Sequence, residues 1–235
     1  MAGKVALITG GTGALGRAVT AAFVEAGAAV AVPYVVDREV PECKESLGAR
    51  AETPLFLKAN ITVEAEVRDV VQAVIQHFGR IEILLTLVGG YVGDLPVVEL
   101  PEATWDQMMN LNLKSAFLCC KHVVPVMQRG SGGRIVTVSS RAAIKVFPGI
   151  SAYAAAKAGL IAFTETLASE VLKDNITVNA ILPSVIDTSA NRKAMPGADY
   201  STWVKPEEIA RVLLFLTSDA SREISGATIP IYGRA

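Results

Sequence analysis

Three side chains in the middle of the sequence have the types and spacing of a proton-transfer site. Tyr153 and Lys157 lie four residues apart in a helix-like stretch, so a helix places them on one face. An ammonium group beside a phenol favours the phenolate, which predicts a lowered pKa for Tyr153 and proton transfer near neutral pH. Ser140 follows an apolar strand-like run, and its hydroxyl can hydrogen-bond a substrate oxygen at the end of that strand.

A glycine-rich segment near the start of the chain has the spacing of a phosphate-binding turn. Gly11, Gly13 and Gly16 fit G-x-G-x-x-G between a predicted strand and a predicted helix. Glycines let the backbone approach a pyrophosphate, whose negative charge the free N–H groups at the helix start can bind. The alternative is a glycine-rich turn without a ligand.

The elements that must position these groups alternate between strand and helix. Strand-like runs cover Val5–Thr9, Ala29–Tyr34, Leu55–Ala59, Ile83–Thr86, Arg134–Ser139, Thr177–Ile181 and Ala227–Ile231. Helical patterns cover Ala14–Ala26, Val63–Phe78, Thr104–Gln128, Ser151–Leu172 and Pro206–Thr217. We therefore expect one α/β domain over residues 1–235, a Rossmann-type doubly wound parallel sheet of about seven strands with helices on both faces. Residues 184–204 are poorly periodic and are predicted to form a substrate loop.

Composition excludes several classes of protein. The formal net charge is −1, which gives no electrostatic case for binding nucleic acid or an anionic membrane. Uncharged stretches are shorter than the roughly 18 residues of a membrane helix, and the first residues lack the features of a signal peptide. Three cysteines and two histidines lack the spacing of a metal site, and three thiols suit a reducing compartment. We expect a cytoplasmic protein without a metal.

In its motifs and their order the chain resembles the short-chain dehydrogenases/reductases over nearly its whole length. Residues 9–16 are similar to the family's T-G-x-x-x-G-x-G turn, and residues 183–188 to its P-G-x-x-x-T segment. Asn112, Ser140, Tyr153 and Lys157 match the four catalytic positions. The resemblance implies that Tyr153 is the acid or base, that Lys157 lowers its pKa and binds the nicotinamide ribose, and that Ser140 orients the substrate oxygen. Asn112 would hold a water that links Lys157 to solvent.

The resemblance also implies a cofactor site, whose predicted residues are Gly10, Thr12, Gly13, Leu15, Gly16, Tyr34, Asp37, Arg38, Asn60, Ile61, Gly89, Tyr153, Lys157, Pro183, Ile186 and Thr188. The sequence departs from the family's pattern at Ala14 and Ser184, which replace glycines, at Asn60, which replaces an acid, and at residues 86–88, which read Thr-Leu-Val. These departures affect mainly the adenosine half of the predicted site.

Cofactor choice depends on the residues after the second predicted strand. Tyr34 stands where relatives that prefer NAD place an acid, so a barrier to the 2′-phosphate of NADP is missing. Arg38 and Arg17 can approach that phosphate, which favours NADP(H). NAD(H) is the alternative, with Asp37 bound to the ribose.

The predicted function is transfer of hydride between NAD(P)(H) and a small carbonyl or alcohol substrate. Candidate substrate-lining residues are Tyr91, Val92, Arg141, Phe147 and residues 189–203, and the substrate class stays open. One alternative is a nucleotide-binding sensor or scaffold of the same fold without turnover. A sugar-nucleotide epimerase or dehydratase is disfavoured by the short segment after Thr188. The apolar composition, 51% hydrophobic, and the resemblance predict a homo-oligomer, expected to be a tetramer.

Overall fold

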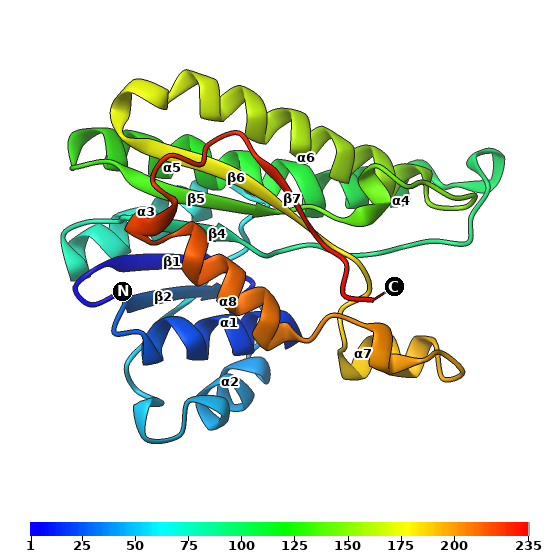
Figure 1. The fold of residues 1–235 in the computed structure, drawn as a ribbon, viewed down its shortest axis with the longest axis horizontal. Coiled ribbons are helices and arrows are strands. Elements are labelled where there is room, and N and C mark those ends of the chain that lie inside the picture. Colours follow the sequence, from blue (N-terminus) through cyan, green and yellow to red (C-terminus); the bar gives the residue numbers. More distant parts are fainter. Residues whose placement is uncertain (235) are drawn as a thin grey trace.

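Parallel strands form one sheet in the order β3-β2-β1-β4-β5-β6-β7 (Figure 1). This computed structural model describes residues 1–234. The strands within that range are β1 (Val5–Thr9), β2 (Ala29–Tyr34), β3 (Leu55–Lys58), β4 (Ile83–Thr86), β5 (Gly133–Val138), β6 (Ile176–Pro183) and β7 (Thr228–Ile231). The chain reverses its direction across the sheet between β3 and β4, so β1 and β4 become neighbours. The expected Rossmann-type α/β fold is confirmed.

Helices cover both faces of the sheet, which explains why its strands read as nearly continuous apolar runs (Figure 1). One face packs against α1 (Ala14–Glu25), α2 (Glu39–Leu47) and α8 (Pro206–Leu216). The other packs against α3 (Glu64–Phe78), α5 (Ser115–Arg129) and α6 (Ser151–Glu170). Two further helices, α4 (Glu102–Met109) and α7 (Ser189–Ala194), lie beyond the carboxyl ends of the strands. Both helix layers bury apolar side chains against the sheet. The candidate site described below lies between the two layers, at the carboxyl ends of the strands.

The structure differs from the sequence-based elements in three places. The single helix expected over Thr104–Gln128 is α4 and α5, joined by one turn of π-helix at Asn110–Lys114. A π-turn inserts a residue without breaking the apolar pattern, so periodicity alone does not reveal it. The helix α2 was not predicted, because it buries only Cys43 and Leu47. The short helix α7 also lies in the expected loop and buries none of its residues.

The glycine-rich turn after β1 depends on close approach of backbone to backbone. Gly10 has a positive φ of 69°, and the first turn of α1 packs directly onto Gly10 and Gly11. A Cβ at Gly16 would overlap the Gly10 carbonyl oxygen and lie 2.6 Å from the Gly11 Cα. At Gly13 the nearest atom to a Cβ would be 3.4 Å away, at ordinary contact distance. Gly16 is therefore required by packing, whereas Gly13 is not.

We predict that Gly16→Ala destabilises the protein much more than Gly13→Ala. Overpacking typically costs about 1–3 kcal/mol, which lowers Tm by roughly 2–4 °C for each kcal/mol in a chain of this size. The Gly13 variant loses only the small preference of a helix N-cap for glycine over alanine. Calorimetric melting of both variants measures the difference. Equal Tm values would contradict the packing role of Gly16.

Candidate active site

Ser140 and Tyr153 come together at the carboxyl end of β5. Ser140 lies two residues past that strand in an extended conformation, where its Oγ accepts a hydrogen bond of 3.1 Å from the Ala142 N–H. Tyr153 lies in the first turn of α6, with its phenol close enough to the Ser140 side chain for that hydroxyl to influence the pKa of Tyr153. Burial raises the pKa of Tyr153, and the Ser140 hydroxyl opposes this rise. The phenol is therefore a protonated donor at neutral pH.

Lys157 lies one turn further along α6 and is almost fully buried, with 4% of its surface exposed. Its Nζ donates a hydrogen bond of 2.7 Å to the Val138 carbonyl oxygen and lies 5.9 Å from the centre of the Tyr153 ring. Burial lowers the pKa of Lys157 to about 8. The predicted effect of Lys157 on the pKa of Tyr153 stays a prediction, because burial is the largest influence on that pKa in this structure. Burial of the phenol outweighs the opposing influence of the Ser140 hydroxyl.

Asn112 lies in the π-turn between α4 and α5 and is 1% exposed. Its Nδ2 donates to the carbonyl oxygens of Gly90 and Met108, both at 3.0 Å, and its Oδ1 accepts from the Gly90 N–H at 3.1 Å. A Cβ at Gly89 would lie 2.7 Å from the Asn112 Oδ1 and 3.2 Å from the Lys157 Nζ. The π-turn thus brings Asn112 and Lys157 to the same glycine at the end of β4.

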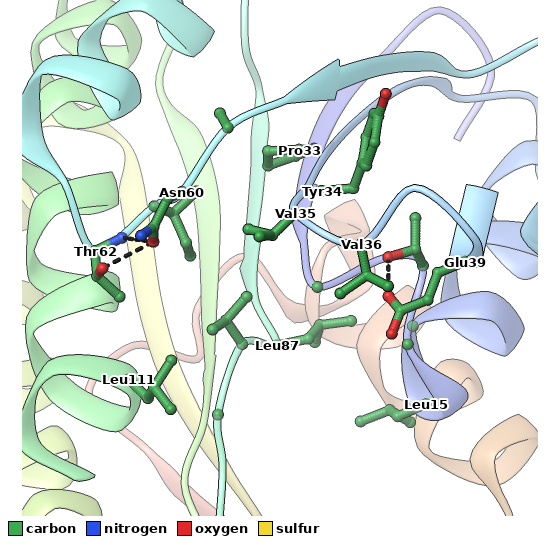
Figure 2. Close-up of a pocket in the computed structure, with 18 of the residues that line it drawn as sticks. Leu15, Pro33, Tyr34, Val35, Val36, Glu39, Asn60, Thr62, Leu87 and Leu111 are labelled. Carbon is green, nitrogen blue, oxygen red and sulfur yellow. Dashed lines mark hydrogen bonds between the residues drawn. The ribbon is translucent and has the colours of Figure 1, made fainter. Parts of the chain in front are cut away.

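A cavity of about 410 Å³ opens at the carboxyl ends of β1, β2, β3 and β4 (Figure 2). It lies at the point where the strand order reverses, which is where open α/β sheets bind ligands. Of the predicted cofactor residues, those that line it are Gly10, Thr12, Gly13, Leu15, Gly16, Tyr34, Asn60, Ile61 and Gly89. Because side chains at Gly10, Gly16 and Gly89 would crowd the neighbouring atoms, this wall is bare backbone. Such a wall fits a dinucleotide, whose pyrophosphate needs close contact with N–H groups.

The remaining predicted cofactor residues lie elsewhere. Asp37 forms an ion pair of 2.6 Å with Lys58, and neither Asp37 nor Arg38 lines the cavity. Tyr34 belongs to the wall, but its ring points away from Leu87 and Glu39 (Figure 2). Tyr153 and Lys157 form the separate cluster at β5, and Pro183, Ile186 and Thr188 follow β6. The prediction that these residues bind cofactor is not tested by their positions.

Several wall residues were not predicted as cofactor ligands, namely Val35, Val36, Glu39, Thr62, Leu87, Val88 and Leu111. Glu39 is the most informative, because its Oε2 accepts a hydrogen bond of 2.7 Å from the Thr12 hydroxyl (Figure 2). It lies 23 residues after Gly16, close to the spacing of about 20 expected for a ribose-binding acid. This spacing could identify Glu39 from the sequence, but Asp37 lies closer to the expected distance from Gly16.

Residues 184–204 form an ordered excursion rather than an irregular loop. Ile186 pairs with Val204, and Thr188 caps α7 by accepting a hydrogen bond of 3.2 Å from the Asn191 N–H. Arg192 forms an ion pair of 2.6 Å with Asp187, and this hydrogen bond lowers the pKa of the Asp187 carboxyl. The guanidinium of Arg192, within the candidate substrate-lining residues 189–203, is therefore already paired.

Aromatic side chains surround the approach to Tyr153. Tyr91 is 56% exposed, and its ring meets that of Tyr153 edge to face, with 5.1 Å between centres. Phe147 is exposed on the segment before α6, and Arg141 lies over the ring of Tyr232 at 5.5 Å. Tyr91 is thus the aromatic side chain that the structure places directly against Tyr153. Within residues 1–234 no cluster of three or more potential metal ligands occurs, and no helix is long and apolar enough to cross a membrane.

Comparison with known proteins agrees with this geometry. The family description short chain dehydrogenase matches residues 4–198. The 3-oxoacyl-acyl-carrier-protein reductase of Thermotoga maritima is 37% identical, with 98% of this chain and 97% of that protein aligned. The NAD-dependent glycerol dehydrogenase of Listeria innocua is 35% identical over 98% of this chain and 92% of its own length. The crystal structure of an NAD⁺-bound xylitol dehydrogenase has a TM-score of 0.90 at 28% identity, covering 99% of this chain and 98% of that one.

The fold and the sequence similarity are those of an α/β oxidoreductase with a Rossmann-type sheet. The chain belongs to the short-chain dehydrogenase family.

We predict that Lys157→Met stabilises the folded protein most at neutral pH and progressively less as the pH rises. The unfolded chain keeps this proton up to a pKa near 10.5, whereas the folded protein releases it near 8. Wild-type stability therefore gains from this group as pH rises across that interval, while the variant does not. Loss of the Val138 hydrogen bond shifts the variant's stability by an amount that does not depend on pH.

The measurement is the difference in Tm between variant and wild type from pH 7 to pH 10. Lys173→Met is the control, because that ammonium is exposed to water in the folded state. A pH-independent difference for Lys157→Met would show that the lysine is not strained by burial.

Proposed function

We propose that this protein transfers hydride between NAD(P)(H) and a small carbonyl or alcohol substrate, with Tyr153 as the acid or base. The carrying observation is that the Tyr153 phenol and Ser140 lie together at the carboxyl end of β5, beside the buried Lys157, whose Nζ is 5.9 Å from the centre of the Tyr153 ring. Such an arrangement holds one proton at a defined oxygen while a second hydroxyl fixes the substrate. The relatives named above are oxidoreductases with different substrates, which supports the reaction class but selects no single substrate.

Each group has a defined task in this proposal. Because its pKa is raised, the Tyr153 hydroxyl carries its proton at neutral pH and donates it when a carbonyl is reduced. Ser140 hydrogen-bonds the same substrate oxygen and stabilises the charge that develops there. Lys157 contributes positive charge below a pH of about 8, and Asn112 fixes the backbone at Gly90, next to Gly89, against which Lys157 lies.

A nicotinamide cofactor would supply the hydride. Its pyrophosphate is proposed to lie on the glycine-rich turn, with Thr12, Leu15, Asn60 and Ile61 around the adenosine half and Gly89 near the nicotinamide half. The sequence-based preference for NADP(H) depends on Arg38 and Arg17. Arg17 is engaged by Glu42 at 2.7 Å and Arg38 lies off the wall, so the geometry gives that preference little support.

The substrate is proposed to enter past Tyr91 and Phe147, with residues 184–204 covering it from the other side. The Tyr91 ring lies against Tyr153 there, and Arg192 is neutralised by Asp187, which favours an uncharged or weakly polar substrate. A cytoplasmic location is part of the same proposal, because the three cysteines are free and buried.

We predict that Tyr153→Phe lowers kcat about 10²–10⁴-fold, the usual contribution of general acid–base catalysis, while cofactor affinity stays near that of wild type. Tyr91→Phe is the matched control. It removes the hydroxyl from the neighbouring ring and keeps the contact between the two rings, so we expect it to reduce turnover far less. Steady-state assays over a panel of ketones, with both cofactors, make the comparison. Cofactor binding by a wild type that turns over none of the panel would favour the sensor or scaffold alternative.

We also propose a homotetramer. Trp105 on α4 and Phe117 on α5 are each at least 40% exposed, and β7 is an edge strand of the sheet. Large aromatic side chains left at the surface favour burial between copies of the chain. Light scattering at micromolar concentration is expected to give about four times the chain mass of 24.8 kDa. A mass of one chain would contradict the proposal.

A further inference from the structure

The cavity wall contains a carboxylate at a position that no sequence motif assigned. Glu39 is the first residue of α2, is half-buried and lines the cavity beside the glycine-rich turn. Its Oε2 accepts the Thr12 hydroxyl proton at 2.7 Å, and Thr12 is itself only 2% exposed (Figure 2). This hydrogen bond holds the carboxylate against the turn, and a carboxylate has a second oxygen with which to accept from a ligand.

Three other charged groups in this region, Arg17, Asp37 and Lys58, are paired away from the cavity. Arg17 donates to the Thr12 carbonyl oxygen at 3.3 Å, but its guanidinium forms an ion pair of 2.7 Å with Glu42. Asp37 and Lys58 neutralise each other. Among the described residues that line the cavity, Glu39 is the charged one. At the glycine-rich turn the carboxylates of Glu39 and Glu42 face the single guanidinium of Arg17, whereas Arg38 at the start of α2 does not line the cavity.

We propose that Glu39 is the residue that selects NAD(H), by accepting hydrogen bonds from the hydroxyl groups of the adenosine ribose and repelling a 2′-phosphate. This inference rests on the proposed use of a nicotinamide cofactor and replaces the sequence-based preference for NADP(H). Hydrogen bonds to a charged acceptor are the strong ones, whereas a phosphate dianion beside a carboxylate is disfavoured. The task assigned by sequence to Asp37 thus passes to an acid two residues later.

The rival is Arg17, which lies close enough to the turn to meet a 2′-phosphate if Glu42 releases it. Neutralising Glu39 and neutralising Glu42 are therefore expected to change the affinity for NADH and NADPH in different ways. Loss of the Glu39 charge removes a ligand of the ribose, whereas loss of the Glu42 charge only frees the guanidinium. Weaker NADH binding is expected from the first change and not from the second.

The experiment is titration of NADH and NADPH into wild type, Glu39→Gln, Glu42→Gln and Glu45→Gln, by calorimetry and by quenching of intrinsic fluorescence. Wild type is expected to bind NADH at least about tenfold more tightly than NADPH. Glu39→Gln should weaken NADH about tenfold, the loss of one charge-assisted hydrogen bond, and tighten NADPH. Glu42→Gln should tighten NADPH alone. Glu45→Gln, on the same helix and exposed, is the control for the lost charge.

Melting curves establish that the isosteric variants are folded. A wild type that prefers NADPH, or a Glu39→Gln variant with an unchanged ratio of affinities, would overturn the assignment. Because affinity is measured without turnover, the result is separate from the proposed reaction. Selective NADH binding without hydride transfer would support Glu39 and refute the proposed catalysis. Hydride transfer by the wild type, together with an unchanged ratio of NADH to NADPH affinity in Glu39→Gln, would support the proposed catalysis and refute the role of Glu39.

Discussion

Two hydrogen bonds that pass through Lys157 in opposite directions hold α6 against the end of β5. The Lys157 Nζ donates to the Val138 carbonyl at 2.7 Å, and the Ser139 hydroxyl donates to the Lys157 carbonyl at 2.8 Å. With this register fixed, Tyr153, one turn earlier on α6, meets Ser140, which follows Ser139 just past the end of β5. Burial of an ammonium is costly, so the protein keeps it only where a carbonyl and a bare glycine leave room for it. The position of Tyr153 follows from these two hydrogen bonds.

The adenosine side is organised by charge pairing rather than by a motif. Both Glu39 and Glu42 lie in the first turn of α2, where negative charge stabilises the helix through its dipole. The same two carboxylates face Thr12 and Arg17 of the glycine-rich turn. These two carboxylates therefore stabilise the first turn of α2 and also set the charge beside the proposed ribose position. This double use explains how a chain with tyrosine at the end of β2 can still present an acid to the cavity.

The sequence was sufficient to predict the α/β fold, the number of strands and the positions of the long helices. Strands buried on both faces and amphipathic helices leave periodic patterns, so these elements can be inferred residue by residue. It also indicated that Ser140 and Tyr153 meet, because a strand end and the helix that follows it adjoin in a parallel sheet. The π-turn at Asn110–Lys114 was not predictable, since its apolar spacing matches that of an uninterrupted helix.

The sequence could not determine which partner each charged side chain would pair with. Asp37 and Glu39 lie two residues apart, and either spacing from Gly16 suits a ribose ligand. Lys58, 21 residues away, takes Asp37 to the outside, and Thr12, 27 residues away, draws Glu39 inward. Likewise the pKa of Tyr153 depends on burial by its neighbours, which a spacing of four residues from Lys157 does not reveal. A motif fixes which elements adjoin, but the direction of each side chain is set by partners far away in the chain. In the proposed assignment, cofactor choice in this protein depends on contacts between the glycine-rich turn and α2, which a motif at the end of β2 does not contain.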